Sequence, residues 1–176
     1  MKTAPLGHRN RQTIRSAMVV AAFVAAGTAA LSMPSAQAVT GSAQVTPASA
    51  AQCEGGANGF VDISDSLSGT IPGPAGSYKR YGQTGHVRIT LEYGTVSGAQ
   101  RGWAKIDGGT FPGDRVWMDR TQDGGSTWLQ CGPFTVGSNG ASKTSAAKNT
   151  SGSSLWRFRA CGDFTGESGY VCTNWW

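Results

Sequence analysis

Histidine and charged residues are scarce in this chain, which narrows the enzymatic chemistry open to it. Its 176 residues include two histidines, and Asp, Glu, Lys and Arg together make up 14% of the sequence. Only His86 lies beyond the first ten residues, and no serine has the Gly-x-Ser-x-Gly surroundings of a nucleophile elbow. The sequence therefore gives little indication of a serine hydrolase.

Patterns that bind metals, nucleotides or other cofactors are also missing from the sequence. The four cysteines show neither the Cys-x-x-Cys nor the Cys–His spacing that structural zinc sites use. Glycine-rich phosphate-binding motifs are missing as well. We therefore expect neither a metal nor another cofactor.

Long apolar runs are confined to the start of the chain. Beyond residue 38, no apolar run reaches the ~20 residues that a membrane-spanning helix needs. Residues 1–38 combine four basic side chains and no acidic one, an apolar stretch at 17–26, and the small-x-small sequence Ala36-Gln37-Ala38. This pattern predicts a signal peptide over 1–38 and a secreted, extracellular product with no membrane attachment after cleavage.

A marked excess of positive charge disappears with the predicted signal. The full chain has 15 basic and 10 acidic residues, a formal charge of +5. Four basic residues and no acidic ones lie within 1–38, so the remaining chain carries +1. Because nucleic-acid binding relies on clustered basic side chains, we expect no nucleic-acid partner.

The remaining 138 residues have the length of a single domain. Residues 39–52 are small and polar without apolar periodicity, and they predict a flexible leader. We expect the folded part to be one β domain over residues 53–176.

All four cysteines, Cys53, Cys131, Cys161 and Cys172, lie in this domain. An oxidising compartment favours two disulfides, and sequence alone permits three ways of pairing them. Cys161 and Cys172 bracket a turn-rich segment between two strand-like stretches, which favours a local bridge there. Cys53 would then pair with Cys131.

Strand patterns recur between glycine-rich turns, whereas capped helical patterns are missing after residue 40. Residues 86–93 alternate between polar and apolar side chains, with the period of a half-buried strand. Similar stretches predict about seven strands, at 60–63, 86–93, 102–106, 115–120, 128–131, 155–161 and 170–175. The expected fold is all-β, an antiparallel two-sheet sandwich.

Residues 121–128 read Thr-Gln-Asp-Gly-Gly-Ser-Thr-Trp, the pattern of an Asp-box. Asp-Gly permits a tight turn, and the Asp side chain can accept backbone N–H groups. The motif therefore predicts a hairpin, without implying catalysis. A second Asp-Gly-Gly at 107–109 predicts another hairpin turn, and the polar stretch 137–154 predicts a mobile loop.

Tryptophan is abundant, and all six copies follow residue 100. Adjacent side chains of an extended strand point to opposite faces, so Trp175 and Trp176 cannot both enter one core. A sugar ring packs on an indole face while polar neighbours bond its hydroxyls. Trp117, Trp175, Trp176 and Asn174 are therefore the candidate carbohydrate-binding residues. Alternatively, the two C-terminal rings cover the end of the sandwich as an apolar lid.

His86, Arg88 and Glu92 share the polar face of one predicted strand and form a weaker, catalytic candidate set. Ribonuclease chemistry commonly combines a carboxylate base, a cation on the phosphate and a histidine acid. An ordinary solvated strand face has the same pattern, and we favour that interpretation. No residue is therefore assigned as catalytic.

Three stretches, 115–128, 156–161 and 171–176, resemble a family of small actinobacterial secreted proteins. Members of that family combine a signal peptide, one Asp-box, two disulfides and a Cys-Thr-x-Trp type of C terminus. Most of them have no known function. A fainter similarity is to secreted bacterial haemagglutinins that bind rhamnose or galactose.

The surplus of aromatic residues and the missing catalytic set favour a non-enzymatic, lectin-like protein. Its expected partner is an extracellular glycan or cell-wall sugar. Two alternatives remain: an inhibitor of extracellular proteases or other protein-binding module, and a small extracellular hydrolase or ribonuclease.

Overall fold

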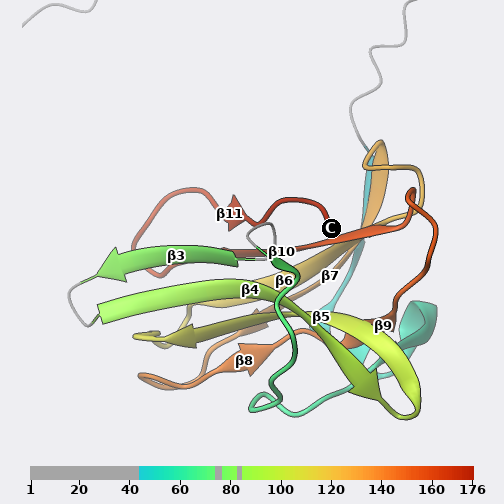
Figure 1. Ribbon diagram of the computed structural model, residues 1–176. Helices are drawn as coiled ribbons and strands as arrows, with labels where there is room; N and C mark the ends of the chain where they lie inside the picture. Colours follow the sequence, from blue (N-terminus) through green and yellow to red (C-terminus); the bar gives the residue numbers. More distant parts are fainter. Residues whose placement is uncertain (1–43, 74–76, 83–84) are drawn as a thin grey trace, which may run out of the picture. The chain divides into compact units, whose positions relative to one another are not determined.

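Two β-sheets pack face to face in the computed structural model of this protein (Figure 1). The structure describes residues 44–73, 77–82 and 85–176. The predicted signal peptide and the first part of the predicted leader lie outside these residues. Among the helices that are described, none has the length and apolar character needed to cross a membrane.

Sheet A has five strands in the order β1-β7-β6-β10-β11. Its strands are β1 (Gln44–Ala48), β6 (Arg115–Thr121), β7 (Thr127–Thr135), β10 (Arg157–Asp163) and β11 (Val171–Cys172). β1 runs parallel to β7, and the other neighbours are antiparallel. The parallel edge strand departs from the wholly antiparallel fold that the sequence predicted.

Sheet B has the order β2-β9-β5-β4-β3, and β8 pairs with the remaining length of β5. Its strands are β2 (Phe60–Val61), β3 (Ser77–Gly82), β4 (Gly85–Val96), β5 (Ala99–Gly108), β8 (Lys143–Thr144) and β9 (Ala147–Asn149). The two longest strands of this sheet, β4 and β5, pair along ten residues.

The core lies between the sheets because alternate residues of their strands turn inwards. In β4 the inward residues are Val87, Ile89 and Leu91, as the alternation in the sequence predicted. β6 contributes Val116 and Met118 to the same cluster, which is also built from Ala104, Ile106, Phe134, Phe158 and Ala160. Burying these side chains is the main favourable term in the folding of the sandwich.

Both predicted disulfides are confirmed. Cys53 pairs with Cys131 across 78 residues, and Cys161 pairs with Cys172 across 11. A cross-link that closes a loop as long as the first contributes roughly 4 kcal/mol in the chain-entropy model. It ties the N-terminal segment to β7.

Part of the stretch predicted as a leader has regular structure. Its residues 44–48 form β1, and Ala50–Glu54 forms the short helix α1. Ser49 and Gln52 cap this helix reciprocally, each side chain accepting from the backbone N–H of the other. The expectation that helices are missing after residue 40 is therefore wrong, because the described residues include α1 and a 3-10 turn at Ala57–Gly59.

Two further predictions about connections are wrong. The second Asp-Gly-Gly does not form a hairpin, because β5 belongs to sheet B and β6 to sheet A. Buried Asp114 organises this crossing by accepting backbone N–H groups from Phe111 and Thr165, each at 2.8 Å. The polar stretch 137–154 contains β8 and β9, and residues 144–147 within it are buried.

Candidate functional site

The face of sheet A that points away from sheet B carries aromatic and charged side chains. Strand alternation sends Val116 and Met118 of β6 into the core and turns Trp117 and Asp119 to the opposite face. The strand register places Gln130 of β7 on one side of Asp119 and Arg159 of β10 on the other. A polar row therefore crosses three strands at the middle of the sheet.

These side chains line a pocket of about 370 Å³, which lies in the range of small-molecule sites. Its walls combine aromatic rings with two arginines and two aspartates. The lining residues are Val45, Arg115, Trp117, Asp119, Trp128, Gln130, Pro133, Arg159, Asp163 and Tyr170.

Asp119 is the most buried polar group of the pocket, with 2% of its surface exposed. Nε and Nη2 of Arg159 both approach the same oxygen, Oδ2, at 2.8 Å. The other oxygen, Oδ1, is buried and accepts no hydrogen bond from the described residues. An acceptor left in this condition costs free energy that a donor on a ligand could recover.

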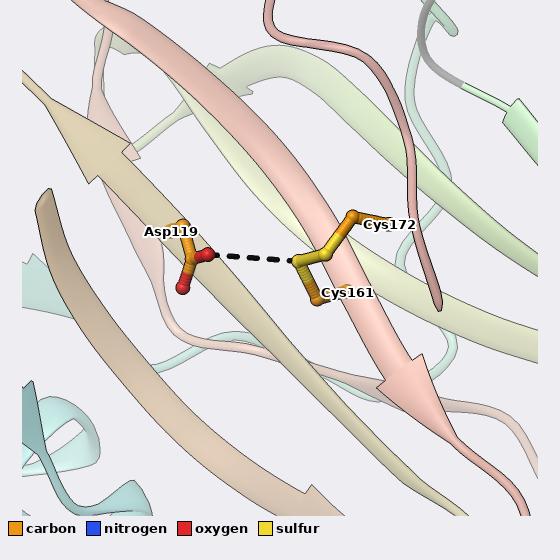
Figure 2. A group of neighbouring side chains, drawn as sticks. All are labelled: Asp119, Cys161 and Cys172. Carbon is orange, nitrogen blue, oxygen red and sulfur yellow. Dashed lines mark hydrogen bonds between the residues drawn. A yellow bond between two sulfur atoms is a disulfide. The ribbon is translucent and has the colours of Figure 1, made fainter. Parts of the chain in front are cut away.

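The sulfur of Cys161 lies 3.6 Å from Oδ2 of Asp119 (Figure 2). A disulfide sulfur carries no proton, so it cannot donate a hydrogen bond to the carboxylate. Burial raises the pKa of Asp119 above its ordinary value, and the hydrogen bond and charge of Arg159 offset this only in part.

Asp119, Cys161 and Cys172 come close enough together to suggest a metal site. Metals bind the thiolate form of cysteine, and here the two sulfurs are bonded to each other. Only the carboxylate remains as a ligand, so these three residues do not fit a metal while the disulfide is intact.

Arg159 contacts two indole rings as well as Asp119. Its guanidinium lies 4.9 Å from the ring centroid of Trp128 and 4.5 Å from that of Trp175. The two rings also meet edge to face, with centroids 6.2 Å apart. Contact with both rings restrains the guanidinium, and with it the side of Asp119 that it occupies.

The other end of the pocket is built from an ion pair and a second pair of rings. Arg115 and Asp163 lie opposite each other on β6 and β10 and form a two-bond ion pair. Trp117 is 7% exposed and packs at 5.6 Å against Tyr170, which is 63% exposed. Tyr170 therefore offers a mostly free ring at the rim.

The loop around Asp123 adjoins this face at the β6–β7 turn. Asp123 accepts hydrogen bonds from the Thr127 backbone N–H at 2.9 and 3.0 Å and from the Thr121 and Thr127 hydroxyls at 2.7 and 2.6 Å. These bonds lower the pKa of Asp123 well below its ordinary value, the hydroxyl of Thr127 having the largest effect. Gly125 adopts φ 110°, a conformation that would be strained for a residue with a side chain, and it faces Trp175.

The predicted carbohydrate-binding residues are divided by the structure. Trp117 lines the pocket, and Trp175 lies beside it against Arg159 and Trp128. Trp176 instead stacks on Tyr93 of sheet B at 4.9 Å, and Asn174 is exposed outside the pocket lining.

The separation of the two C-terminal indoles follows from the strand pairing. Cys172 lies opposite Cys161, yet Trp176 exchanges both backbone hydrogen bonds with Phe158. One extra residue is therefore accommodated between these pairs, as in a β-bulge. Trp176 consequently shares the inward side of Phe158, while Trp175 contacts the outer face.

Trp117 is the one residue of this pocket lining that was singled out from the sequence as ligand-binding, and the residues missed include Asp119, Trp128, Arg159 and Tyr170. The available signal was strand alternation, because Asp119 and Arg159 each alternate with core residues on their own strands. Their meeting depends on the pairing of β6 with β10, which alternation does not predict.

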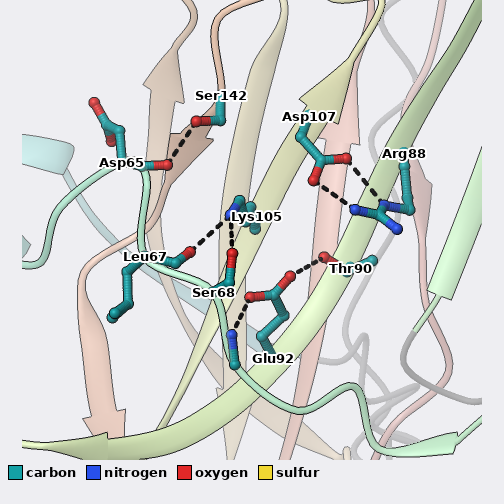
Figure 3. Close-up of polar contacts among 10 residues, drawn as sticks. Asp65, Leu67, Ser68, Arg88, Thr90, Glu92, Lys105, Asp107 and Ser142 are labelled. Atoms are coloured by element: carbon teal, nitrogen blue, oxygen red, sulfur yellow. Dashed lines mark hydrogen bonds and ion pairs between the residues drawn. The ribbon is translucent and has the colours of Figure 1, made fainter.

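The weaker set of His86, Arg88 and Glu92 lies on the outer face of sheet B, because these residues alternate with the core residues Val87, Ile89 and Leu91. Figure 3 shows Arg88 and Glu92 on this face. Arg88 donates two hydrogen bonds to Asp107, at 3.0 and 2.7 Å. Glu92 is 3% exposed and accepts from the Gly69 backbone N–H at 2.8 Å and the Thr90 hydroxyl at 3.1 Å. Glu92 thus has a structural role, whereas His86 and Arg88 border a separate pocket with Asp107.

Residues 64–70, which we call the strap, cover this part of sheet B. Lys105 is 5% exposed and donates to the Leu67 carbonyl at 2.7 Å and the Ser68 hydroxyl at 3.0 Å (Figure 3). Gly69 lies so close to Trp103 that an added Cβ would be 2.6 Å from the indole. The strap therefore closes this face of sheet B and pairs Glu92 and Lys105, whereas Nε1 of Trp103 is buried without a partner among the described residues.

Comparison with protein-family models, with curated proteins and with solved structures found no significant match. The chemistry of the outer pocket of sheet A is therefore the basis for the functional conclusion.

Proposed function

We propose that this protein is an exported, non-enzymatic carbohydrate-binding protein whose ligand occupies the outer pocket of sheet A. The observation that carries the proposal is the buried, unpaired Oδ1 of Asp119 in a pocket walled by aromatic rings. Export rests on the signal pattern of residues 1–38.

A sugar matches this pocket because it presents two kinds of surface. Its C–H faces pack on aromatic rings, and its hydroxyls donate and accept hydrogen bonds. Trp117, Trp128 and Tyr170 supply rings, while Asp119 and Gln130 supply polar groups. Tyr170 has the most accessible of these rings.

We also propose that residues 121–128 form an Asp-box whose role is to hold the β6–β7 turn. Asp123 is occupied by Thr121 and Thr127, which suits a folding role. Its contribution to binding is indirect: the turn leads into Trp128 and contacts Trp175 through Gly125.

A glycan array followed by isothermal titration with the secreted protein tests the proposal. We expect at least one sugar to bind, and Tyr170→Ala to weaken that binding about tenfold, in line with the loss of an aromatic contact. Phe111→Ala is the matched control, since Phe111 is also an exposed aromatic residue, at 42%, but lies outside the pocket. Equal loss in both variants, or no sugar binding at all, would refute the proposed site.

A protein-binding module is the second candidate function. One observation favours it: Tyr170 is exposed in a segment whose ends are tied by Cys161–Cys172, and rigid exposed tyrosines are common anchors in protein interfaces. Affinity capture from the extracellular medium with wild-type protein and Tyr170→Ala separates the two functions. A Tyr170-dependent protein partner, with no sugar binding, would favour this second function.

A further inference from the structure

The charges that line the outer pocket of sheet A cancel in pairs. Its charged lining residues are Arg115 and Asp163, which bond to each other, and Arg159 and Asp119, which do the same. A ligand carboxylate would have to compete with an aspartate for an arginine. A ligand ammonium would add a positive charge to a pocket whose two arginines already neutralise its two aspartates. The pocket therefore has no net charge with which to select a charged ligand.

The hydrogen-bonding capacity of the pocket is, in contrast, incomplete. Arg159 places two donors on Oδ2 of Asp119 and leaves Oδ1 without a donor among the described residues. Arg159 also contacts the rings of Trp128 and Trp175, which hold its guanidinium on the Oδ2 side of Asp119. The missing group is a single donor.

We infer that the ligand is an uncharged sugar, one hydroxyl of which donates a hydrogen bond to Oδ1 of Asp119. This inference rests on the proposed carbohydrate-binding function and narrows its ligand class. Uronic acids and amino sugars are disfavoured by the paired charges. A neutral hexose supplies the donor without breaking either ion pair.

The variant Asp119→Asn replaces the unpaired acceptor Oδ1 with a hydrogen-bond donor. Arg159 requires an acceptor, so the amide oxygen takes the place of Oδ2 and the NH₂ group takes the place of Oδ1. The position that accepted a hydrogen bond then donates one. A fluorine substituent, which can only accept, becomes compatible with the variant although it is incompatible with the wild type.

Titration calorimetry with neutral and charged sugars tests the charge preference. The probes are the methyl glycosides of galactose, glucose and mannose, each compared with its uronic acid and its 2-amino counterpart. We expect a neutral form to bind at least tenfold more tightly than both charged forms. Tighter binding of a charged form would overturn the inference while leaving a sugar-binding site in place. If none of the nine probes binds, the inference fails. The proposed carbohydrate-binding function is then tested by the glycan array alone.

Monofluorinated versions of the neutral sugar that binds best then test the role of Asp119. For the wild type, fluorine at one ring position should weaken binding about tenfold or more, the cost of a lost bond to a carboxylate. For Asp119→Asn, the same substitution should weaken binding less than twofold. A wild type indifferent to fluorine at every position overturns the inference whether or not the variant folds. An unchanged fluorine profile in the folded variant overturns it as well.

Discussion

The outer faces of the two sheets differ in how their aromatic and charged side chains are covered. Each carries aromatic and charged side chains that the core cannot take. On sheet B the strap covers Trp103, and Glu92 and Lys105 are paired with its backbone. On sheet A a pocket remains open, and an oxygen of Asp119 has no partner among the described residues.

The difference indicates where binding capacity resides in this molecule. On the sheet B face Glu92 and Lys105 are paired, and the buried Nε1 of Trp103, which has no partner among the described residues, does not line the pocket that His86 and Arg88 border. On the sheet A face the unpaired buried acceptor belongs to a residue that lines a pocket with aromatic walls, so a ligand that supplies a donor there gains free energy. The sheet B face is therefore expected to contribute to stability, and the sheet A face to binding.

The largest effect on stability is expected when the positive partner of Asp119 is removed. Arg159→Met leaves a buried carboxylate without its cation and should lower the free energy of unfolding by about 3 kcal/mol. Arg157→Met, two residues earlier on the same strand at an exposed position, should cost less than about 0.5 kcal/mol. Urea denaturation followed by tryptophan fluorescence measures both.

The double variant Asp119→Asn with Arg159→Met sharpens this first prediction. With the carboxylate neutralised, the loss of Arg159 should be less costly than it is alone. If removing Arg159 costs as much in the Asp119→Asn background as it does in the wild type, the pair is not coupled in the way described.

Glu92→Ala, in sheet B, should lower the free energy of unfolding by about 2 kcal/mol, because the Gly69 N–H of the strap and the Thr90 hydroxyl lose their acceptor. Glu54→Ala, at an exposed glutamate, is the control and should be nearly neutral. Sugar binding should remain unchanged in both variants, as measured by titration calorimetry. Loss of binding in a folded Glu92→Ala protein would contradict the division of roles between the two faces.

Gly69→Ala should destabilise the protein by roughly 1–3 kcal/mol through crowding under the strap. The added Cβ would lie 2.6 Å from both the Trp103 ring and the Tyr93 carbonyl oxygen. Gly137→Ala provides the comparison, because an added Cβ there meets nothing within 4 Å. Gly69→Ala should therefore have a clearly lower melting temperature than Gly137→Ala. Equal melting temperatures would argue against the close approach of the strap to Trp103.

The smallest effect concerns pH and the loop around Asp123. Its pKa is lower in the folded protein than in the unfolded chain, where an aspartate has a pKa of about 3.9. The stabilisation is therefore complete above that value and is lost as the pH falls below it. Asp123→Asn should be less stable than the wild type at pH 6, and the gap should narrow on acidification below pH 4. Thermal melts across that range test the prediction, which fails if the gap widens in acid.

Much of the fold could be predicted from local pattern, because alternation and turn chemistry are local properties. The alternation of residues 86–93 identified the inward side of β4, and the turn between Cys161 and Cys172 identified their bridge. The edge strand β1 was missed, since its residues show no apolar pattern and it is held by backbone pairing with β7. The buried residues 144–147 (Thr-Ser-Ala-Ala) were missed because small side chains in a polar stretch resemble a loop until β5 is placed beside them.

The candidate site was predictable only in part for a related reason. The number of tryptophans indicated that some rings lie outside the core, and Trp117 was among the candidates. The role of Asp119 depends on Arg159, which lies 40 residues away in sequence. Nothing within either strand indicates that one oxygen would be paired and the other left open.

By itself the sequence determined a β-rich chain with two disulfides, the inward sides of its main strands, and more aromatic residues than one core can hold. These properties depend on neighbours a few residues apart and on composition. Only the tertiary structure decided which outer face is covered and which holds a pocket. That outcome depends on the register between distant strands and on the path of the strap, and sequence-local forces do not fix either one.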